Sequence, residues 1–229
     1  MGLFRRRAAS TVHDDAPGAE VEEASRGDGE TAGPYDIAQV PELGARIDLG
    51  ALRVPALKGM QLRVALDPKG RVPVAATLGL DGSTVQLQVL AAPKSASLWD
   101  ELRPTLAESF VARGGSCEER DAAFGPELRA RVPVTAKGGS GYSSLRVVGV
   151  DGPRWLLRAV ISGPAAVQEE AMAWADGVIR RVVVNRGKEA RPPREVLPLT
   201  VPGMQTTRPA PETDPLSLLQ RGPELTETR

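Results

Sequence analysis

The sequence predicts an α+β protein: a single domain with a mostly antiparallel sheet of about seven strands and two helices, between disordered N- and C-terminal tails. Short segments with alternating apolar and polar residues follow one another, separated by turn residues, which is typical of strands joined as hairpins. Two longer segments repeat apolar residues at helical spacing. Hydrophobic residues make up 41% of the 229 positions, which is enough for one core.

Both ends of the chain are poor in large apolar residues. Residues 1–33 consist mainly of Ala, Gly, Ser, Asp and Glu, and residues 201–229 are rich in Pro, Thr and Glu. Such segments bury too little apolar surface to offset the entropy of ordering the chain. We therefore predict two disordered tails around a folded domain at residues 34–200.

The first half of the domain contains three segments with apolar and polar alternation: residues 61–66, 72–78 and 85–89. Asp81-Gly82 separates the last two, and this pair favours a tight hairpin turn that needs positive φ. We expect antiparallel strands on either side of it. A shorter apolar pattern at residues 45–54 contains Gly50 and precedes Pro55, so it predicts an edge strand at best.

The first helix is expected to begin after Ser97, whose side chain can cap the free amides of the first turn. Four apolar residues then recur at spacing four: Leu98, Leu102, Leu106 and Phe110. Pro104 lies inside this pattern and predicts either a kink or a restart of the helix. Gly114-Gly115 ends it.

Two further strands and a glycine-rich connection are expected after this helix: residues 117–123, 128–135 and 137–144. Residues 145–150 and 155–161 are apolar on both faces, which predicts central strands covered on each side. We assign residues 151–153 to the turn between them.

The second helix is expected to start at Gly163-Pro164, because Pro suits the first helical position. Its apolar stripe consists of Val167, Ala171, Trp174 and Val178. Residues 182–184 predict a last short strand. Leu197 and Leu199 are expected to pack onto the domain as a terminal extension.

Several of these segments carry a family resemblance. The sequence DGPRWLLR at residues 151–158 is followed by Gly163-Pro164 and by VVNRG at residues 183–187, and LWDE at residues 98–101 precedes Gly114-Gly115. In these segments the chain resembles an actinobacterial family known only as a domain of unknown function, DUF3710. The resemblance covers residues 34–200; it implies a soluble cytoplasmic protein and supplies no catalytic residues. The order of elements also resembles the Mog1/PsbP type of α+β fold.

Charge and residue counts argue against several classes of function. The chain has 29 basic and 29 acidic residues, so no global field draws it to nucleic acid or to a membrane. Cys117 is the single cysteine and His13 the single histidine, which leaves no disulfide and no Cys or His pair for a metal. No stretch approaches the ~18–20 apolar residues that span a bilayer. We expect a cytoplasmic protein with no membrane insertion, no metal and no cofactor.

An enzyme would have to use Glu118, Glu119, Asp121 and Lys137. In a strand, Glu119 and Asp121 share one face and Glu118 takes the other, which is typical of a solvated edge. Acidic neighbours raise the pKa of the Cys117 thiol and so do not activate it. We therefore predict that the protein is not an enzyme, and a carboxylate-dependent enzyme of unknown type is the weakest alternative.

Basic residues gather at the end of the second helix and beyond it: Arg180, Arg181, Arg186, Lys188, Arg191 and Arg194. The structural interpretation is a helix C-terminus complemented by cations, followed by a solvated connection. The functional interpretation is an anion or partner patch, which with Arg5-Arg6-Arg7 would give weak nucleic-acid or nucleotide binding. The loop at residues 137–144 could also contact an anion, but it lacks the order of a P-loop and precedes a strand.

The C-terminal tail contains one apolar cluster, formed by Leu216, Leu218 and Leu219 after Asp214-Pro215. This segment could form one amphipathic turn in a partner's groove. It is shorter than the ~12–15 residues at which isolated helices persist in water, so we expect it to be helical only when bound. The leading hypothesis is a non-enzymatic binding or scaffold protein of the cytosol that contacts a protein partner.

Overall fold

The computed structural model describes residues 33–69, 72–136 and 139–201. The chain divides into two units, residues 1–31 and 32–229, and the described residues all belong to the second unit. This unit has the predicted α+β class, with two α-helices and two sheets in its described part. The tails that we expect to be disordered fall largely outside the described residues.

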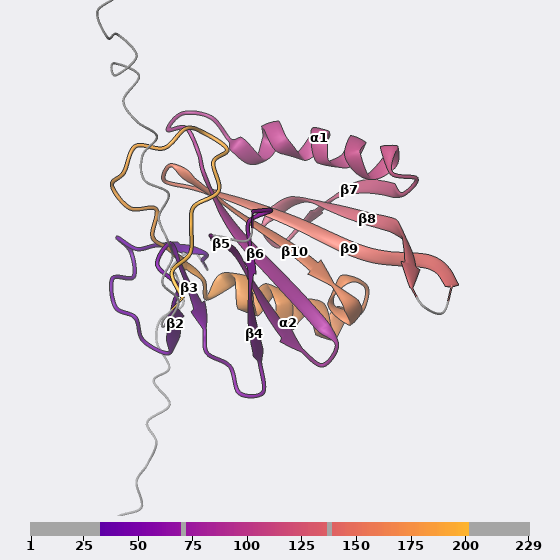
Figure 1. The fold of residues 1–229 in the computed structure, drawn as a ribbon, viewed down its shortest axis with the longest axis horizontal. Helices are drawn as coiled ribbons and strands as arrows, with labels where there is room; N and C mark the ends of the chain where they lie inside the picture. The colour runs from indigo at the N-terminus through magenta and orange to yellow at the C-terminus, as the bar shows by residue number, and fades with distance from the viewer. Residues whose placement is uncertain (1–32, 70–71, 137–138, 202–229) are drawn as a thin grey trace, which may run out of the picture. The chain divides into compact units, whose positions relative to one another are not determined.

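A seven-stranded antiparallel sheet forms the centre of the domain, in the order β4-β5-β6-β10-β9-β8-β7 (Figure 1). Asp81 and Gly82, at the turn between β5 and β6, have φ of 49° and 76°, which confirms the predicted tight turn. The strands are β4 (Gln61–Leu66), β5 (Pro73–Leu80), β6 (Ser83–Ala91), β7 (Ser116–Ala122), β8 (Gly125–Ala136), β9 (Gly139–Gly152) and β10 (Trp155–Ser162).

A second, smaller sheet has the order β1-β11-β3-β2 and consists of β1 (Tyr35–Asp36), β2 (Arg46–Asp48), β3 (Leu52–Pro55) and β11 (Val183–Val184). The prediction of one edge strand at residues 45–54 is wrong. Gly50, with φ of 77°, allows the chain to turn between two strands, and β3 lies inside the sheet. Leu52 and Val54 are fully buried, because α2 and the large sheet share their core with this small sheet.

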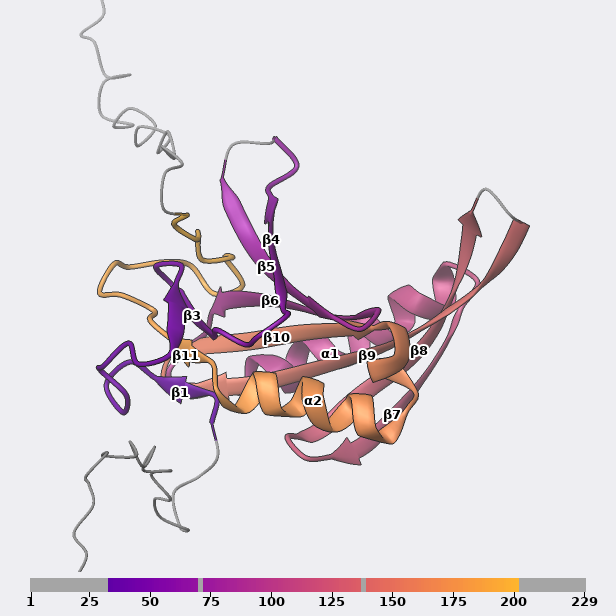
Figure 2. The same ribbon diagram turned by 90° about the horizontal axis from the view of Figure 1, so that it is seen from below.

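Two helices lie on opposite faces of the large sheet (Figures 1 and 2). Helix α2 (Glu169–Arg180) buries Ala175, Val178 and Ile179 in a large apolar cluster with β5, β6, β9 and β10. Helix α1 (Leu98–Ala112) buries Leu98 and Trp99 in a second cluster with residues of β6, β8, β9 and β10. Each helix therefore covers only part of the sheet.

Helix α1 begins as the sequence predicts and has an additional cap. Ser97 Oγ accepts a hydrogen bond from the Asp100 amide at 3.0 Å. The carboxylate of Asp151 accepts hydrogen bonds from the amides of Leu98 and Trp99, at 3.0 and 3.2 Å. The helix runs through Pro104 without a restart.

The assignment of residues 151–153 to a turn is wrong in detail. Strand β9 continues to Gly152, which pairs with Trp155, so the turn residues are Pro153 and Arg154. Arg154 adopts φ of 65°. Asp151 is a strand residue that caps α1, a contact between residues more than fifty positions apart that no local pattern reports.

Helix α2 begins later than the sequence predicts. Gly163-Pro164 starts a 3₁₀ turn, η1 (Gly163–Ala166), because Ser83 Oγ accepts the Ala165 amide and holds this turn against β6. Val167 then leaves helical geometry, with φ of −137°, and α2 starts at Glu169. Val167 is 59% exposed, so it does not belong to the predicted apolar stripe.

After β11, the last strand of the small sheet, the chain returns to the large sheet. The amide of Leu197 donates to the Val89 carbonyl at 2.8 Å, and the amide of Leu199 donates to the Pro73 carbonyl at 2.7 Å. Both leucines are buried, which confirms the predicted terminal extension.

Candidate functional site

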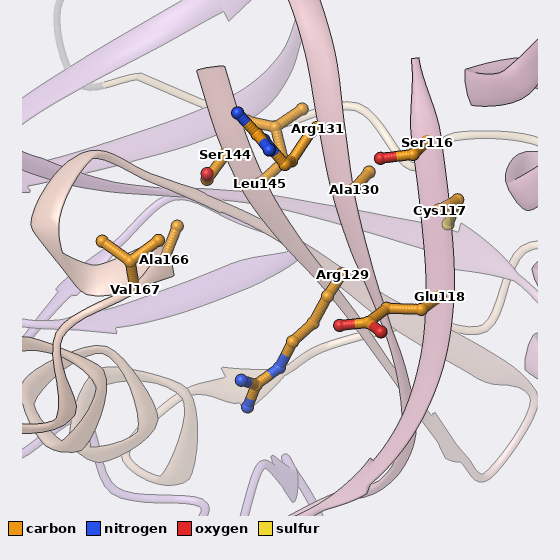
Figure 3. Close-up of a pocket in the computed structure, with 10 residues that line it drawn as sticks. All are labelled: Ser116, Cys117, Glu118, Arg129, Ala130, Arg131, Ser144, Leu145, Ala166 and Val167. Carbon is orange, nitrogen blue, oxygen red and sulfur yellow. The ribbon is translucent and has the colours of Figure 1, made fainter. Parts of the chain in front are cut away.

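A groove lies at the β7–β9 end of the large sheet, on the face that α2 covers elsewhere (Figure 3). Its volume is about 560 Å³, and Val167 after η1 forms an apolar wall. The strand register groups the polar side chains, because residues directly opposite on neighbouring strands share a face. One row across three strands consists of Ser116, Arg131 and Ser144, and the next contains Glu118 and Arg129.

Two of the three charged side chains that line this groove, Glu118 and Arg129, form ion pairs with residues next to it. Arg120 donates to Glu118 at 2.9 Å and holds the pKa of that carboxyl below its usual value. Arg129 donates to Glu127, also at 2.9 Å. A carboxylate held in its ionised form in this way is a poor general acid at neutral pH.

Arg131 is placed differently. Its guanidinium lies 5.3 Å from the centre of the Tyr142 ring, and Tyr142 is 62% exposed. A second hollow of about 340 Å³ shares Ser116 and Arg131 with the groove and reaches Tyr142. Arg131 and Tyr142 therefore form an accessible cation and aromatic pair beside the groove.

Beneath the groove, a buried ionic network joins the sheet to α2. Arg146 on β9 donates to Glu127 Oε2 at 2.7 Å and to Asp176 Oδ1 on α2 at 3.2 Å. Arg146 and Glu127 are 2% and 1% exposed. Burial acts to lower the pKa of Arg146, but the hydrogen bonds and charges of Glu127 and Asp176 outweigh it and raise that pKa. The network fixes the position of α2 over the sheet.

The acidic residues that we considered for catalysis are divided between the two faces of β7. Glu118 points into the groove, whereas Glu119 forms an ion pair with Arg103 of α1, 2.9 Å apart, on the opposite face. This division agrees with the alternation predicted for a strand. Asp121 shares the face of Glu119, as the pairing of β7 with β8 shows.

Cys117 packs against the apolar cluster under α1 and is half-buried. Burial raises the pKa of its thiol, and the charges of Glu118 and Glu119 raise it further. The predicted direction of this shift is confirmed, although burial is the larger cause. The thiol is therefore mostly protonated at neutral pH.

Two arginines of the basic segment after α2 have carboxylate partners. Arg191 donates to Glu195 at 2.6 Å and to Glu189 at 2.9 Å. Arg194 forms an ion pair with Glu101 of α1. These pairs offset part of the positive charge that the sequence places there.

The other basic residues of that segment have different surroundings. The guanidinium of Arg180 lies over the Phe124 ring, 5.2 Å from its centre. Arg186 donates to the carbonyl of Glu189, and burial together with neighbouring arginines lowers its pKa. Arg181 and Lys188 are exposed.

Several predicted sites lie outside the described residues: Lys137, His13, Arg5-Arg6-Arg7, and Leu216, Leu218 and Leu219. The glycine-rich loop is described from Gly139 onward, where it already belongs to β9. The expectation of a longer irregular connection there is wrong, because Ala136 pairs with Gly139 across the hairpin.

Of the groove residues, the sequence analysis singled out only Glu118, Cys117 and Ser144, and it identified no member of the Arg146 network as a site. One signal was present: Arg146 is the single charge in an apolar segment that predicts a strand covered on both faces. A charge buried in this way needs a partner of opposite sign. Its partners, Glu127 and Asp176, could not be identified, because neighbours across a sheet and between layers are not encoded in local spacing.

In the part of the chain that the structure describes, no group of three or more His, Cys, Asp or Glu side chains is arranged to hold a metal ion. Among the same residues, no helix is both long enough and apolar enough to cross a bilayer.

Fold and groove together define an α+β domain with an open, charged sheet surface. The chain belongs to the family described as Protein of unknown function (DUF3710), whose model matches residues 33–208. This confirms the family resemblance seen in the sequence. No curated protein matches the chain.

Among solved structures, the chain is similar to the solution structure of cyanobacterial PsbP (CyanoP) from Synechocystis sp. PCC 6803. Sequence identity is 11%, and the match covers 61% of this chain and 91% of that one, with a TM-score of 0.37.

Proposed function

We propose that this protein is a non-enzymatic binding or scaffold module of the cytoplasm, and that it contacts a protein partner through the groove of β7–β9. The observation that carries the proposal is the accessible Arg131–Tyr142 pair beside a groove whose other charged groups are largely paired internally. Tyr and Arg are enriched in protein interfaces, because each combines a large contact area with directional polar groups.

The composition of the groove indicates what the partner presents. Arg131 stands between two hydroxyl groups, those of Ser116 and Ser144, and these donors suit an acidic side chain. Val167 offers an exposed apolar contact on the other wall. We infer a partner segment in which an acidic residue adjoins an apolar one.

Site-specific photo-crosslinking in native lysate tests this proposal. The full-length chain carries p-benzoylphenylalanine in place of Tyr142, which keeps an aromatic ring at the groove. Val111 is the matched control position, because it is 58% exposed but lies on α1, on the opposite face of the sheet. We expect one crosslinked partner from position 142 and none from position 111.

Arg131→Glu should abolish that crosslink, because the groove would then repel an acidic side chain. Equal crosslinking from both positions, or none from position 142, would remove the groove from the proposal.

Nucleic-acid or nucleotide binding through the basic segment from Arg180 to Arg194 ranks second. Its charge is reduced by the carboxylate partners of Arg191 and Arg194. Phosphate contacts would make retention on DNA depend steeply on salt. Loss of low-salt retention when Arg181 and Lys188 are changed to Ala would favour this alternative.

A further inference from the structure

The large sheet has a second open area, on the face opposite the groove. In Figure 1, α1 lies above β7–β9, and α2 is seen behind β4 and β5. Strand β6 has buried and half-buried residues in alternation, and its half-buried residues on this face are Thr84, Gln86 and Gln88. This half of the sheet is therefore lined by hydrogen-bonding side chains where a covering layer would require apolar ones.

Cross-strand pairing extends this polar face over four strands. Gln88 is opposite Arg158 of β10, and Gln86 is opposite Thr77 of β5. Thr77 is in turn opposite Arg63 of β4. Val160 of β10, opposite Gln86, is apolar and packs on the cluster under α1. The other described residues named in these rows are two cations and neutral amides and hydroxyls, without a carboxylate.

Arg158 lies where this face meets the area covered by α1, and it is poorly satisfied within the described part of the chain. Its guanidinium donates to the neutral Oε1 of Gln88, while its Nε is buried and has no hydrogen-bond partner. Burial lowers the pKa of Arg158. A half-buried cation with no counter-ion among the described residues costs free energy, and ionisable groups perturbed in this way cluster at functional sites.

Arg158 lies between the part of this face that α1 covers and a neighbouring hollow whose lining does not include Arg158, Gln86 or Gln88. On the α1 side, the indole of Trp99 covers Gly149, the direct cross-strand neighbour of Arg158. On the other side, a hollow of about 370 Å³ is lined by Arg63, Thr77 and Thr84. Asp81, at the turn that closes this hollow, is the one carboxylate in its lining.

We propose that this polar face binds a small anionic molecule whose phosphate or carboxylate group pairs with Arg158, while its other polar groups hydrogen-bond the amides of Gln86 and Gln88. The site is independent of the partner groove, because the two lie on opposite faces of the sheet and share no lining residue. A guanidinium can hold either anion through two parallel hydrogen bonds, so the shared chemistry is an oxyanion.

Amide NMR titration of the full-length protein with three probes tests the proposal: ribose 5-phosphate, citrate and neutral ribose. At least one of the two anions should shift the amides around Gln88 and Arg158 in a saturable way, and ribose should not. Stronger binding of ribose 5-phosphate would identify a phosphate ligand, and stronger binding of citrate a carboxylate ligand. If neither anion gives saturable shifts, or if the shifts occur only around Arg131, the site does not exist.

Two variants distinguish a binding role of Arg158 from a structural one. Arg158→Met removes the unpaired charge, and Gln88→Glu supplies a permanent counter-ion beside it. We expect each to weaken anion binding at least tenfold without lowering the melting temperature, because neither leaves a buried cation unpaired. Arg120→Met, on the exposed edge strand, is the matched control and should bind like the natural chain.

Undiminished binding by both variants would overturn the proposal. A large fall in the melting temperature of Arg158→Met would also contradict it, because Arg158 would then contribute to the stability of the sheet. If Arg158→Met does not fold, the anion affinity of Gln88→Glu still tests the proposal.

Discussion

Arg146 shows at the scale of single residues how a charge is accommodated at the centre of this sheet. It reaches Glu127 on the neighbouring strand and Asp176 on α2, so two elements supply its counter-charges. One of its atoms, Nη1, is buried without a hydrogen-bond partner among the described residues. The network is therefore expected to be sensitive to the loss of any member.

Glu127→Gln should lower the free energy of unfolding by about 3 kcal/mol, because it leaves Arg146 buried with one remaining carboxylate. Urea denaturation measures this loss. The double variant Glu127→Leu with Arg146→Met should recover at least half of it, since both charges leave together. If the double variant is less stable than Glu127→Gln, the prediction is wrong, and the ionic network stabilises the fold more than apolar residues in its place would.

Cys117 permits a prediction of pH dependence, because it is the only cysteine in the chain. The thiolate is the reactive form, and both burial and acidic neighbours raise the pKa of this thiol. Alkylation by iodoacetamide near pH 7.5 should therefore be slower than that of a free cysteine. It should accelerate only as the pH rises above about 8.5, the ordinary pKa of a thiol.

Glu118→Gln with Glu119→Gln should lower the thiol pKa and increase the rate at pH 7.5, because two negative charges that oppose the thiolate are removed. In urea, where both chains are unfolded, the natural chain and the variant should be alkylated at the same rate. Alkylation of the folded natural chain as fast as that of glutathione would contradict the raised pKa.

At the scale of elements, the N-terminus of α1 joins a local signal to a distant one. Ser97 caps the helix from the preceding residue, and Asp151 caps it from the end of β9. Asp151→Ala should cost about 1–2 kcal/mol, because two helix amides and the Ser97 hydroxyl lose an acceptor. Glu108→Ala, at an exposed position in the middle of the same helix, is the control and should change stability by less than about 0.5 kcal/mol.

Thermal unfolding followed by circular dichroism compares the two variants. If Asp151→Ala and Glu108→Ala melt at the same temperature, the hydrogen bonds from β9 do not anchor α1.

Elements that depend on local chemistry could be predicted from the sequence. The turn at Asp81-Gly82, the cap at Ser97 and the alternation of β6 each follow from the residues that form them. The start of α2 could not be placed, because the 3₁₀ turn at Gly163–Ala166 is held by Ser83 of another strand. Strand β3 could not be recognised as internal, because its burial depends on the small sheet around it.

The candidate sites illustrate the same limit. The edge strand β7 and its two faces were predictable from alternation alone, including the separation of Glu118 from Glu119. The groove and the polar face were not, because each combines side chains from three or more strands. Register determines such combinations, and one residue of slip would move every side chain to the other face.

At the scale of the whole described domain, two helices are too few to cover a sheet of seven strands. Helix α2 with the small sheet covers one face at the β5–β10 end, and α1 covers the other face at the β7–β9 end. The two uncovered areas therefore lie diagonally opposite each other. Both are lined by polar and charged side chains, so the domain presents two chemically different surfaces, each available for recognition.

The C-terminal segment contributes Leu197 and Leu199 to the core, whereas residues 202–229 lie outside the described part of the chain. A chain that ends after Val201 keeps Leu197 and Leu199 in the core and should melt at the temperature of the full chain. A chain that ends after Pro193 loses both leucines and their hydrogen bonds to β6 and β5. At about 1.5–3 kcal/mol for each buried side chain, its free energy of unfolding should fall by at least about 3 kcal/mol.

Leu197→Ala in the full chain is the matched control for this comparison, and it should cost about 2–5 kcal/mol through the cavity it leaves.

The chain ending after Val201 also lacks Leu216, Leu218 and Leu219. Reduced crosslinking at position 142 with an unchanged melting temperature would therefore assign those leucines to partner binding. A lower melting temperature for that chain would instead mean that residues 202–229 stabilise the fold, because every buried contact cited above would still be present.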